Sequence, residues 1–202
     1  MVSQLLSLPV NIPFKRIYNR MGQRVSTEIS VDMKDKIDRT INEAFMICEL
    51  KARYGIFDVK SNDGKNIVIG TETFVSESFC NLVKNCGKIA LFAVTIGDKL
   101  MEKRQMFLDD SEIFNAVVYD AVGSEIAEEG AEYMHYFLGK IAASKGGSIM
   151  KRRFSPGYSD MSLEMQKKVF KLLNPEAIGI RLSSSCLMIP EKSVTAFVGI
   201  EG

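Results

Sequence analysis

An arginine, a Pro-Gly turn and a tyrosine follow one another within six positions of the chain. The Arg153 guanidinium is a planar group that can bind a carboxylate through two parallel hydrogen bonds. Pro156 fixes its own φ, and Gly157 lacks the Cβ that would hold a flat ligand away from the main chain. Main-chain groups beside Ser155 can hydrogen-bond a purine edge, and the Tyr158 ring can face a cation. The same spacing also fits an ordinary exposed turn, so the motif alone leaves both interpretations open.

A long helical segment precedes this loop and carries another candidate group. Helical periodicity extends over residues 111–142. Small and apolar side chains gather on one stripe of this helix: Ala116, Ala127, Ala131, Met134, Leu138 and Ile141. Three glutamates fall roughly opposite, on the polar side: Glu125, Glu129 and Glu132. Glu128 lies at the border between the two faces, where a carboxylate can reach into a cleft beside the helix. An ordinary surface glutamate is the alternative.

The first part of the chain contains signals for several shorter elements. A short helix is predicted over residues 13–21, because proline stands in its first turn and glycine follows its end. A longer helix is predicted from the N-cap Asp32 through Ala52, since apolar residues recur at helical spacing. Two β-rich runs, 55–60 and 66–70, flank an Asp-Gly turn and predict a hairpin.

Helices and strands are mixed in the remainder of the chain. The further predicted helices cover residues 76–84, 97–107 and 162–174, and the further predicted strands cover 88–96, 178–182 and 193–200. Several strands are joined by short links, so we expect an α+β fold with a twisted, largely antiparallel sheet and flanking helices. No clear linker divides residues 1–202, which we therefore expect to form a single domain.

The composition excludes several classes of function. The 202 residues include 26 basic and 25 acidic side chains, a net charge of +1, whereas nucleic-acid-binding proteins usually carry a basic excess. No apolar run approaches the roughly 20 residues that span a bilayer. The first residues lack the basic region of a signal peptide. These features predict a cytoplasmic protein with no nucleic-acid or membrane partner.

The cysteines and the single histidine do not suggest a metal site. Cys48, Cys80, Cys86 and Cys186 form no CxxC pair. His135 is the only histidine, which argues against zinc enzymes and Cys-His hydrolases. We expect reduced thiols packed as small apolar side chains.

The order of motifs in the last third resembles the activation domain of cobalamin-dependent methionine synthase. In that family, an R-x-x-P-G-Y loop is followed by a helix and then by an L-T-E-S-x-x-M-x-P-x-x-S-V strand pair. This chain has a similar order: the loop 153–158, a helix, and the segment 181–194 (RLSSSCLMIPEKSV). The upstream helix, with Glu128 and the run 131–135 (AEYMH), is similar to the family helix before the loop. This specific similarity covers about residues 113–200.

The earlier part of the chain resembles the short, free-standing members of this family, notably at residues 14–18 and 91–97. By this resemblance, residues 1–110 form a helical and hairpin region, and residues 111–202 form the S-adenosylmethionine-binding part.

The resemblance implies S-adenosylmethionine as ligand and cobalamin, carried by a partner protein, as the group that is methylated. The expected partners are a corrinoid-binding methionine synthase subunit and a flavodoxin-like or other one-electron donor. One electron and a methyl group would together return cob(II)alamin to methylcobalamin. Proximity and orientation would supply the rate gain, so no residue is expected to act as a catalytic acid or nucleophile. We expect no turnover without the cobalamin partner.

Carried over residue by residue, the resemblance assigns five ligand-binding positions. Arg153 would meet the ligand carboxylate, and the main chain of Ser155, Gly157 and Tyr158 would hold the adenosyl portion. Glu128 would meet the ribose hydroxyls or the cationic part of the ligand.

The chain also departs from the family pattern. Ser184 stands where the family usually has a glutamate, and residues 159–164 replace a Pro- and His-containing segment of the larger members. An alternative function is therefore a non-enzymatic docking partner of a corrinoid protein, with weak or no nucleoside binding.

Overall fold

The computed structural model describes residues 2–22 and 29–202. The helices are α1 (Phe14–Arg20), α2 (Val31–Met46), α3 (Glu77–Leu82), α4 (Lys99–Asp109), α5 (Ile113–Ala143) and α6 (Gln166–Leu173), with 3-10 turns at Leu163–Met165 and Pro175–Ile178. The strands are β1 (Val2–Leu5), β2 (Lys51–Asn62), β3 (Asn66–Ile69), β4 (Glu72–Val75), β5 (Lys88–Thr95), β6 (Ser148–Ile149), β7 (Arg181–Leu182), β8 (Met188–Ile189) and β9 (Ser193–Glu201).

One antiparallel sheet runs through the molecule in the order β4-β3-β2-β5-β9-β6, and β1 pairs with β2 beside it. Strands β7 and β8 form a small separate pair. The predicted α+β class and the largely antiparallel sheet are confirmed. The central strand β5 lies between β2 and β9, so residues 1–110 and 111–202 contribute to the same sheet.

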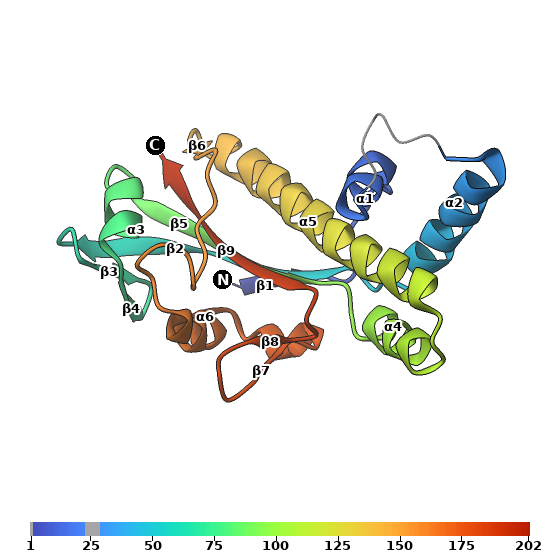
Figure 1. The fold of residues 1–202 in the computed structure, drawn as a ribbon. Coiled ribbons are helices and arrows are strands. Elements are labelled where there is room, and N and C mark those ends of the chain that lie inside the picture. The colour runs from blue at the N-terminus through green and yellow to red at the C-terminus, as the bar shows by residue number, and fades with distance from the viewer. Residues whose placement is uncertain (1, 23–28) are drawn as a thin grey trace.

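The sheet is covered on both faces, as Figure 1 shows with α5 crossing one face and α6 lying on the other. Alternate side chains of β5 point to opposite faces of the sheet. Ala90, Phe92 and Val94 join the core beneath α5, whereas Ile89, Leu91 and Ala93 join the core that includes α6. All six are buried, which explains the unbroken apolar run that predicted a central strand. No helix among the described residues is long and apolar enough to cross a membrane.

The second helix ends earlier than its periodicity predicted. Helix α2 ends at Met46, and Ala52 already belongs to β2, where it pairs with Leu5 and Val94. Its N-cap is Ser30, whose hydroxyl accepts a hydrogen bond from the Met33 amide at 3.3 Å, and not Asp32. The prediction was wrong because pairing with β1 and β5 outweighs a local helical pattern.

The strand predicted at 178–182 is also shorter than expected. Residues Pro175–Ile178 form a 3-10 turn, and only Arg181 and Leu182 pair as a strand. Gly179 ends this turn with φ +87°, a left-handed conformation that interrupts an extended chain.

Glu125 was placed on the polar side of the long helix, but in the structure it is buried. Its carboxylate accepts a hydrogen bond from Arg20 Nε at 2.6 Å and lies 3.1 Å from Arg16 Nε. Both arginines come from α1, which packs on α5. A buried carboxylate is tolerated when it is paired in this way, and a wheel drawn for one helix does not show the partner.

Gly130 allows α5 to approach the sheet closely. A Cβ at this position would lie 2.7 Å from Val94 Cγ1 and 3.3 Å from Leu50 Cδ2. We therefore expect Gly130→Ala to destabilise the protein by about 1–3 kcal/mol, although Gly→Ala inside a helix normally stabilises by about 0.5–1 kcal/mol. Urea denaturation measures the difference. Gly87→Ala is the control, because its Cβ would meet nothing within 4 Å; an equal effect of both changes would contradict the packing argument.

Candidate functional site

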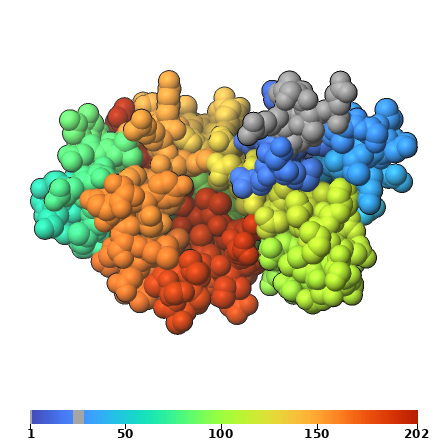
Figure 2. All heavy atoms as spheres, viewed as in Figure 1, coloured from blue at the N-terminus to red at the C-terminus, as the bar shows by residue number. Residues whose placement is uncertain are grey.

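A cavity with a volume of about 1130 Å³ lies between α5 and the C-terminal third of the chain. In Figure 2 the orange and red residues of this third lie on one face beside the yellow-green residues of the α4–α5 region. The cavity walls come from α5, the loop 151–158, the segment 183–191 and β9. Sites for small organic ligands usually measure about 300–1,000 Å³, so a nucleoside-sized molecule fits easily.

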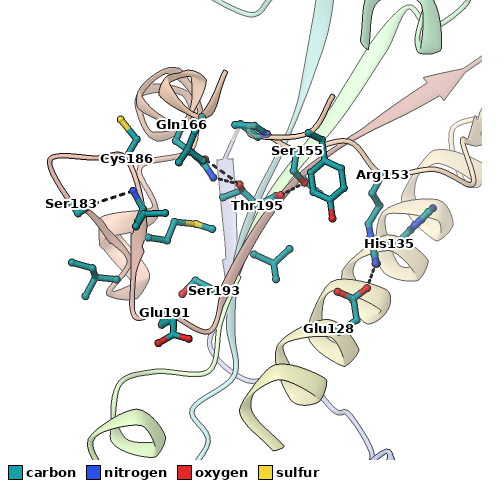
Figure 3. A pocket seen from close by; sticks show the side chains of 18 of the residues that line it. Glu128, His135, Arg153, Ser155, Gln166, Ser183, Cys186, Glu191, Ser193 and Thr195 are labelled. Carbon is teal, nitrogen blue, oxygen red and sulfur yellow. Dashed lines mark hydrogen bonds and ion pairs between the residues drawn. The ribbon is translucent and has the colours of Figure 1, made fainter. Parts of the chain in front are cut away.

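Four of the five predicted site residues line this cavity: Glu128, Arg153, Ser155 and Tyr158. The Arg153 guanidinium donates to the Glu128 carboxylate (Figure 3). It also lies 3.6 Å from Glu132, one helical turn further along α5. The sequence assigned Glu128 and Arg153 to different parts of a ligand and did not predict that they contact each other.

His135 also lines the cavity, on the same helix (Figure 3). Its Nε2 lies 2.9 Å from the main-chain oxygen of Met150, and this hydrogen bond ties α5 to the chain that leads into the loop. His135 thus holds α5 against the main chain that carries Arg153 at the wall of the cavity.

Arg153 has capacity for a further partner. Its Nη1 atom is buried and has no hydrogen-bond partner among residues 2–22 and 29–202. A buried guanidinium nitrogen without a partner is costly. Because this atom is buried, a ligand carboxylate would reach it only after the guanidinium turns toward the cavity, and Nη1 would then gain the partner that it lacks.

The charges on the cavity wall favour a cationic ligand overall. Three carboxylates line it, those of Glu128, Glu132 and Glu191, against the cations of Lys151 and Arg153. Among these five side chains, one negative charge is in excess. The wall can therefore hold a carboxylate at Arg153 while attracting a molecule whose net charge is positive.

The loop 153–158 is held firmly against β9. Phe154 and Phe197 exchange main-chain hydrogen bonds of 2.9 and 2.7 Å, and the Phe154 ring stacks on Phe79 at 5.1 Å. The Ser155 hydroxyl donates to the Thr195 carbonyl at 2.6 Å. Ser155 therefore reaches the cavity as part of a fixed strand pairing.

The two remaining loop residues occupy a tight turn. The Gly157 amide donates to Met161 O at 2.9 Å, and the Tyr158 amide donates to Ser155 O at 3.1 Å. Gly157 has φ +90°, which explains why glycine stands there, and it does not line the cavity. Tyr158 is 68% exposed at the rim. The amides of both residues are thus engaged within the turn.

Sequence reasoning missed a buried polar pair in the wall of the cavity. The Gln166 amide nitrogen donates to Thr195 Oγ1 at 2.8 Å, and Thr195 Oγ1 lies 3.1 Å from Gln166 Oε1 (Figure 3). Gln166 is 3% exposed and Thr195 is 2% exposed. A signal was available in the sequence: the buried positions of α6 are Gln166, Val169, Phe170 and Leu173, so the glutamine stands on the apolar stripe.

Asp160 anchors the chain that follows the loop. Its carboxylate accepts hydrogen bonds from the Ser76 hydroxyl at 2.5 Å and from the amides of Glu77 and Ser78 at 2.6 and 3.2 Å, at the start of α3. The hydrogen bond from Ser76, followed by those from Ser78 and Glu77, lowers the Asp160 pKa to about 2.

The hydrogen bonds to Asp160 predict that the stability of the protein depends on pH. Because the folded-state pKa is depressed, the stabilisation is present above the unfolded pKa of about 3.9 and is lost as the pH falls through about 2. We expect Asp160→Asn to lower the melting temperature at neutral pH and to have less effect near pH 3. Thermal unfolding at both pH values tests this, with Asp110→Asn at an exposed position as control. A decrease that is the same at both pH values would contradict the assignment.

The described residues hold no cluster of three or more His, Cys, Asp or Glu side chains suited to a metal ion. Cys80, Cys86 and Cys186 are buried and Cys48 is half-buried, all as free thiols. Burial raises the pKa of the Cys48 thiol to about 12. Cys186 lines the cavity but is 3% exposed.

The described residues combine a largely antiparallel α+β fold with a charged cavity beside α5, a concave site of the kind in which proteins usually bind small molecules. Residues 74–201 match the family model described as the activation domain of vitamin B12-dependent methionine synthase. The chain belongs to this family. Every residue that lines the cavity falls within the matched stretch.

A solved structure supports the fold assignment along the whole chain. It is described as the crystal structure of the MetH reactivation domain bound to AdoHcy, and it matches with a TM-score of 0.72. The match covers 98% of this chain and 78% of that one, and the two are 17% identical in sequence. The structure therefore shares the fold of this protein.

Proposed function

We propose that this protein binds S-adenosylmethionine in the cavity beside α5 and supports the reductive reactivation of a cobalamin-dependent methionine synthase in trans. In this reaction one electron from a flavodoxin-like or other donor reduces cob(II)alamin on the partner. The methyl group of S-adenosylmethionine passes to the reduced cobalt, and S-adenosylhomocysteine leaves. Family membership and the placement of Arg153 in the cavity support this proposal.

The main support is the group of charges formed by Arg153, Glu128 and Glu132. The amino-acid end of S-adenosylmethionine has a carboxylate and an ammonium group, and its sulfonium adds a second positive charge. The Arg153 guanidinium would bind the carboxylate, and the two glutamates would face the cationic centres. The net charges of ligand and wall are opposite in sign.

The part played by the protein in this scheme is positioning. The loop is fixed by its pairing with Phe197, and α5 is fixed to the loop through His135. A rigid wall holds the methyl donor in one orientation, which is the main contribution a protein can make to a transfer between two bound groups.

The charge argument predicts a preference between two related ligands. S-adenosylmethionine carries a net positive charge, and S-adenosylhomocysteine lacks the sulfonium charge. We expect the methyl donor to bind several-fold more tightly at low ionic strength, with a smaller difference at physiological ionic strength. Isothermal titration with both ligands measures this. Glu128→Gln should reduce the preference; an unchanged ratio would show that the glutamate does not face the sulfonium.

Reconstitution tests the complete proposal. The protein is mixed with a methionine synthase that lacks an activation domain, a one-electron reductant and S-adenosylmethionine, and the loss of cob(II)alamin is followed by absorbance. We expect the loss to require both the protein and the methyl donor. If the protein binds S-adenosylmethionine but cob(II)alamin persists, reactivation in trans is refuted. If it binds no nucleoside, the role of a docking partner is favoured.

A further inference from the structure

A second cavity, of about 610 Å³, lies between α6 and the segment that leads into β7. It shares no described residue with the cavity beside α5, although adjacent positions of the chain line the two. Gln166 and Ser183 belong to the first cavity, and Lys167 and Leu182 belong to the second. In Figure 1, α6 and the β7–β8 pair lie close together at the lower edge of the molecule. The same two segments therefore border two distinct cavities.

Cations dominate the wall of the second cavity. Lys167 and Lys171 come from α6 and Arg181 from β7, whereas Glu176 is the one acid among the described residues that line it. Within residues 2–22 and 29–202, none of the three cations forms an ion pair. Lys167 and Lys171 stand four positions apart on one helix, where like charges repel. Three cations against one carboxylate leave an excess of two positive charges.

The end of α6 brings these cations together. Asn174 ends the helix in a left-handed conformation, with φ +50°, and the 3-10 turn Pro175–Ile178 follows directly. The chain then reaches β7, where Arg181 pairs with Ile189 through its main chain. The position of Arg181 beside the helix is therefore fixed by the fold, and its side chain lines the same cavity as Lys171.

The wall also has an apolar part. Phe170 is 7% exposed, and Leu182 packs partly buried against the same core. Both line the cavity together with the three cations. A site that combines a small apolar surface with clustered donors suits an organic anion better than a bare inorganic ion. Its volume lies within the range of about 300–1,000 Å³ that is usual for small-molecule sites.

We propose that this second cavity binds a small phosphate ester. The phosphate lies between Arg181 and the two lysines, and the organic part covers Phe170 and Leu182. A phosphate monoester carries a charge of about −1.5 to −2 at neutral pH, which matches the excess of two positive charges, whereas a carboxylate supplies one charge only. The planar guanidinium also fits two phosphate oxygens at once. This site goes beyond the proposed function, which stands or falls independently of it.

Titration with phenyl phosphate tests the assignment, because this probe joins a phosphate dianion to a small ring. It is titrated calorimetrically into the full chain at low ionic strength. We expect Arg181→Ala to weaken binding about tenfold, the effect of losing one charge-assisted contact. Arg152→Ala is the matched control, because Arg152 is also an exposed arginine and lines neither cavity. Benzoate keeps the ring but has a single charge, so it should bind several-fold more weakly than phenyl phosphate.

The outcomes that would overturn the assignment are distinct from one another. No binding of phenyl phosphate up to millimolar concentrations would refute the site. Equal weakening by Arg181→Ala and Arg152→Ala would show attraction to diffuse surface charge only, and equal affinity for benzoate would exclude a phosphate site. NMR of the wild type gives a readout that needs no variant to fold. The amide resonances of Arg181 and Leu182 should shift with phenyl phosphate, and shifts confined to the loop 153–158 would place the probe in the other cavity.

Discussion

Replacing Arg153 with alanine is expected to lower the affinity for S-adenosylmethionine about 100-fold, because charge-assisted hydrogen bonds to a ligand carboxylate are worth about 1.5–3 kcal/mol. The change also leaves Glu128 and Glu132 without the cation between them. Both glutamates are substantially solvent-exposed, with side chains 39% and 56% accessible, so water screens them and stability should change little. Calorimetric titration, with a melting curve of each protein, separates the two effects.

The neighbouring arginine provides the control for this experiment. Arg152 is exposed and does not line the cavity, so Arg152→Ala should bind with wild-type affinity. Arg153→Lys keeps the charge but loses the planar pair of donors, and an intermediate affinity is expected. Equal binding by the wild type and Arg153→Ala would remove the ligand carboxylate from this end of the cavity.

Among the substitutions proposed for this protein, Phe197→Ala should lower the free energy of unfolding the most, by about 3–5 kcal/mol. Its ring is 1% exposed and packs against Phe74 and Phe79 at centroid distances of 5.0 and 5.1 Å. Its main chain also pairs with Phe154, so the cavity created beneath it adjoins the ligand-binding loop. Urea denaturation gives the change in free energy, and the melting temperature of a protein of this size should fall by roughly 6–20 °C.

Phe114→Ala, at a half-buried ring on α5, is the comparison for Phe197→Ala. It should cost clearly less, because a ring that remains partly in water leaves a smaller cavity when it is removed. If the two substitutions lower the free energy of unfolding equally, the tight packing between the phenylalanines around Phe154 does not determine the stability of this region.

The elements with strong local signals could be predicted from the sequence. The long helix α5 and the central strand β5 each have an uninterrupted pattern of their own. The hairpin between β2 and β3 was predicted from Asp63-Gly64, and the Asp63 carboxylate does accept the amides of Lys65 and Asn66 at 2.9 and 2.6 Å. Turn chemistry of this kind acts over a few residues, which is why sequence reasoning detects it.

Elements that depend on distant partners could not be predicted. The four-residue strand β1 exists because β2 offers it a neighbour some fifty positions later, as in the pairing of Val2 with Gly55. The same applies to Glu125, whose burial requires arginines from α1. Neither case leaves a periodic signal in the segment itself.

The candidate site was predicted in its residues but not in their contacts. Glu128 and Arg153 were both selected, yet their mutual ion pair depends on how α5 crosses the sheet. Gln166 was missed because an isolated glutamine in an amphipathic helix resembles a surface residue, and only the stripe it occupies indicates otherwise. The five assigned positions remain predictions about the ligand.

The shared central strand has a consequence for any attempt to isolate a minimal binding fragment. The stretch that matches the family begins at residue 74, inside β4, and therefore excludes β2. In such a fragment β5 would present a bare row of amides and carbonyls along an apolar strand, which is a template for intermolecular pairing. Self-association, more than loss of ligand contacts, would then limit what the shortened chain can do.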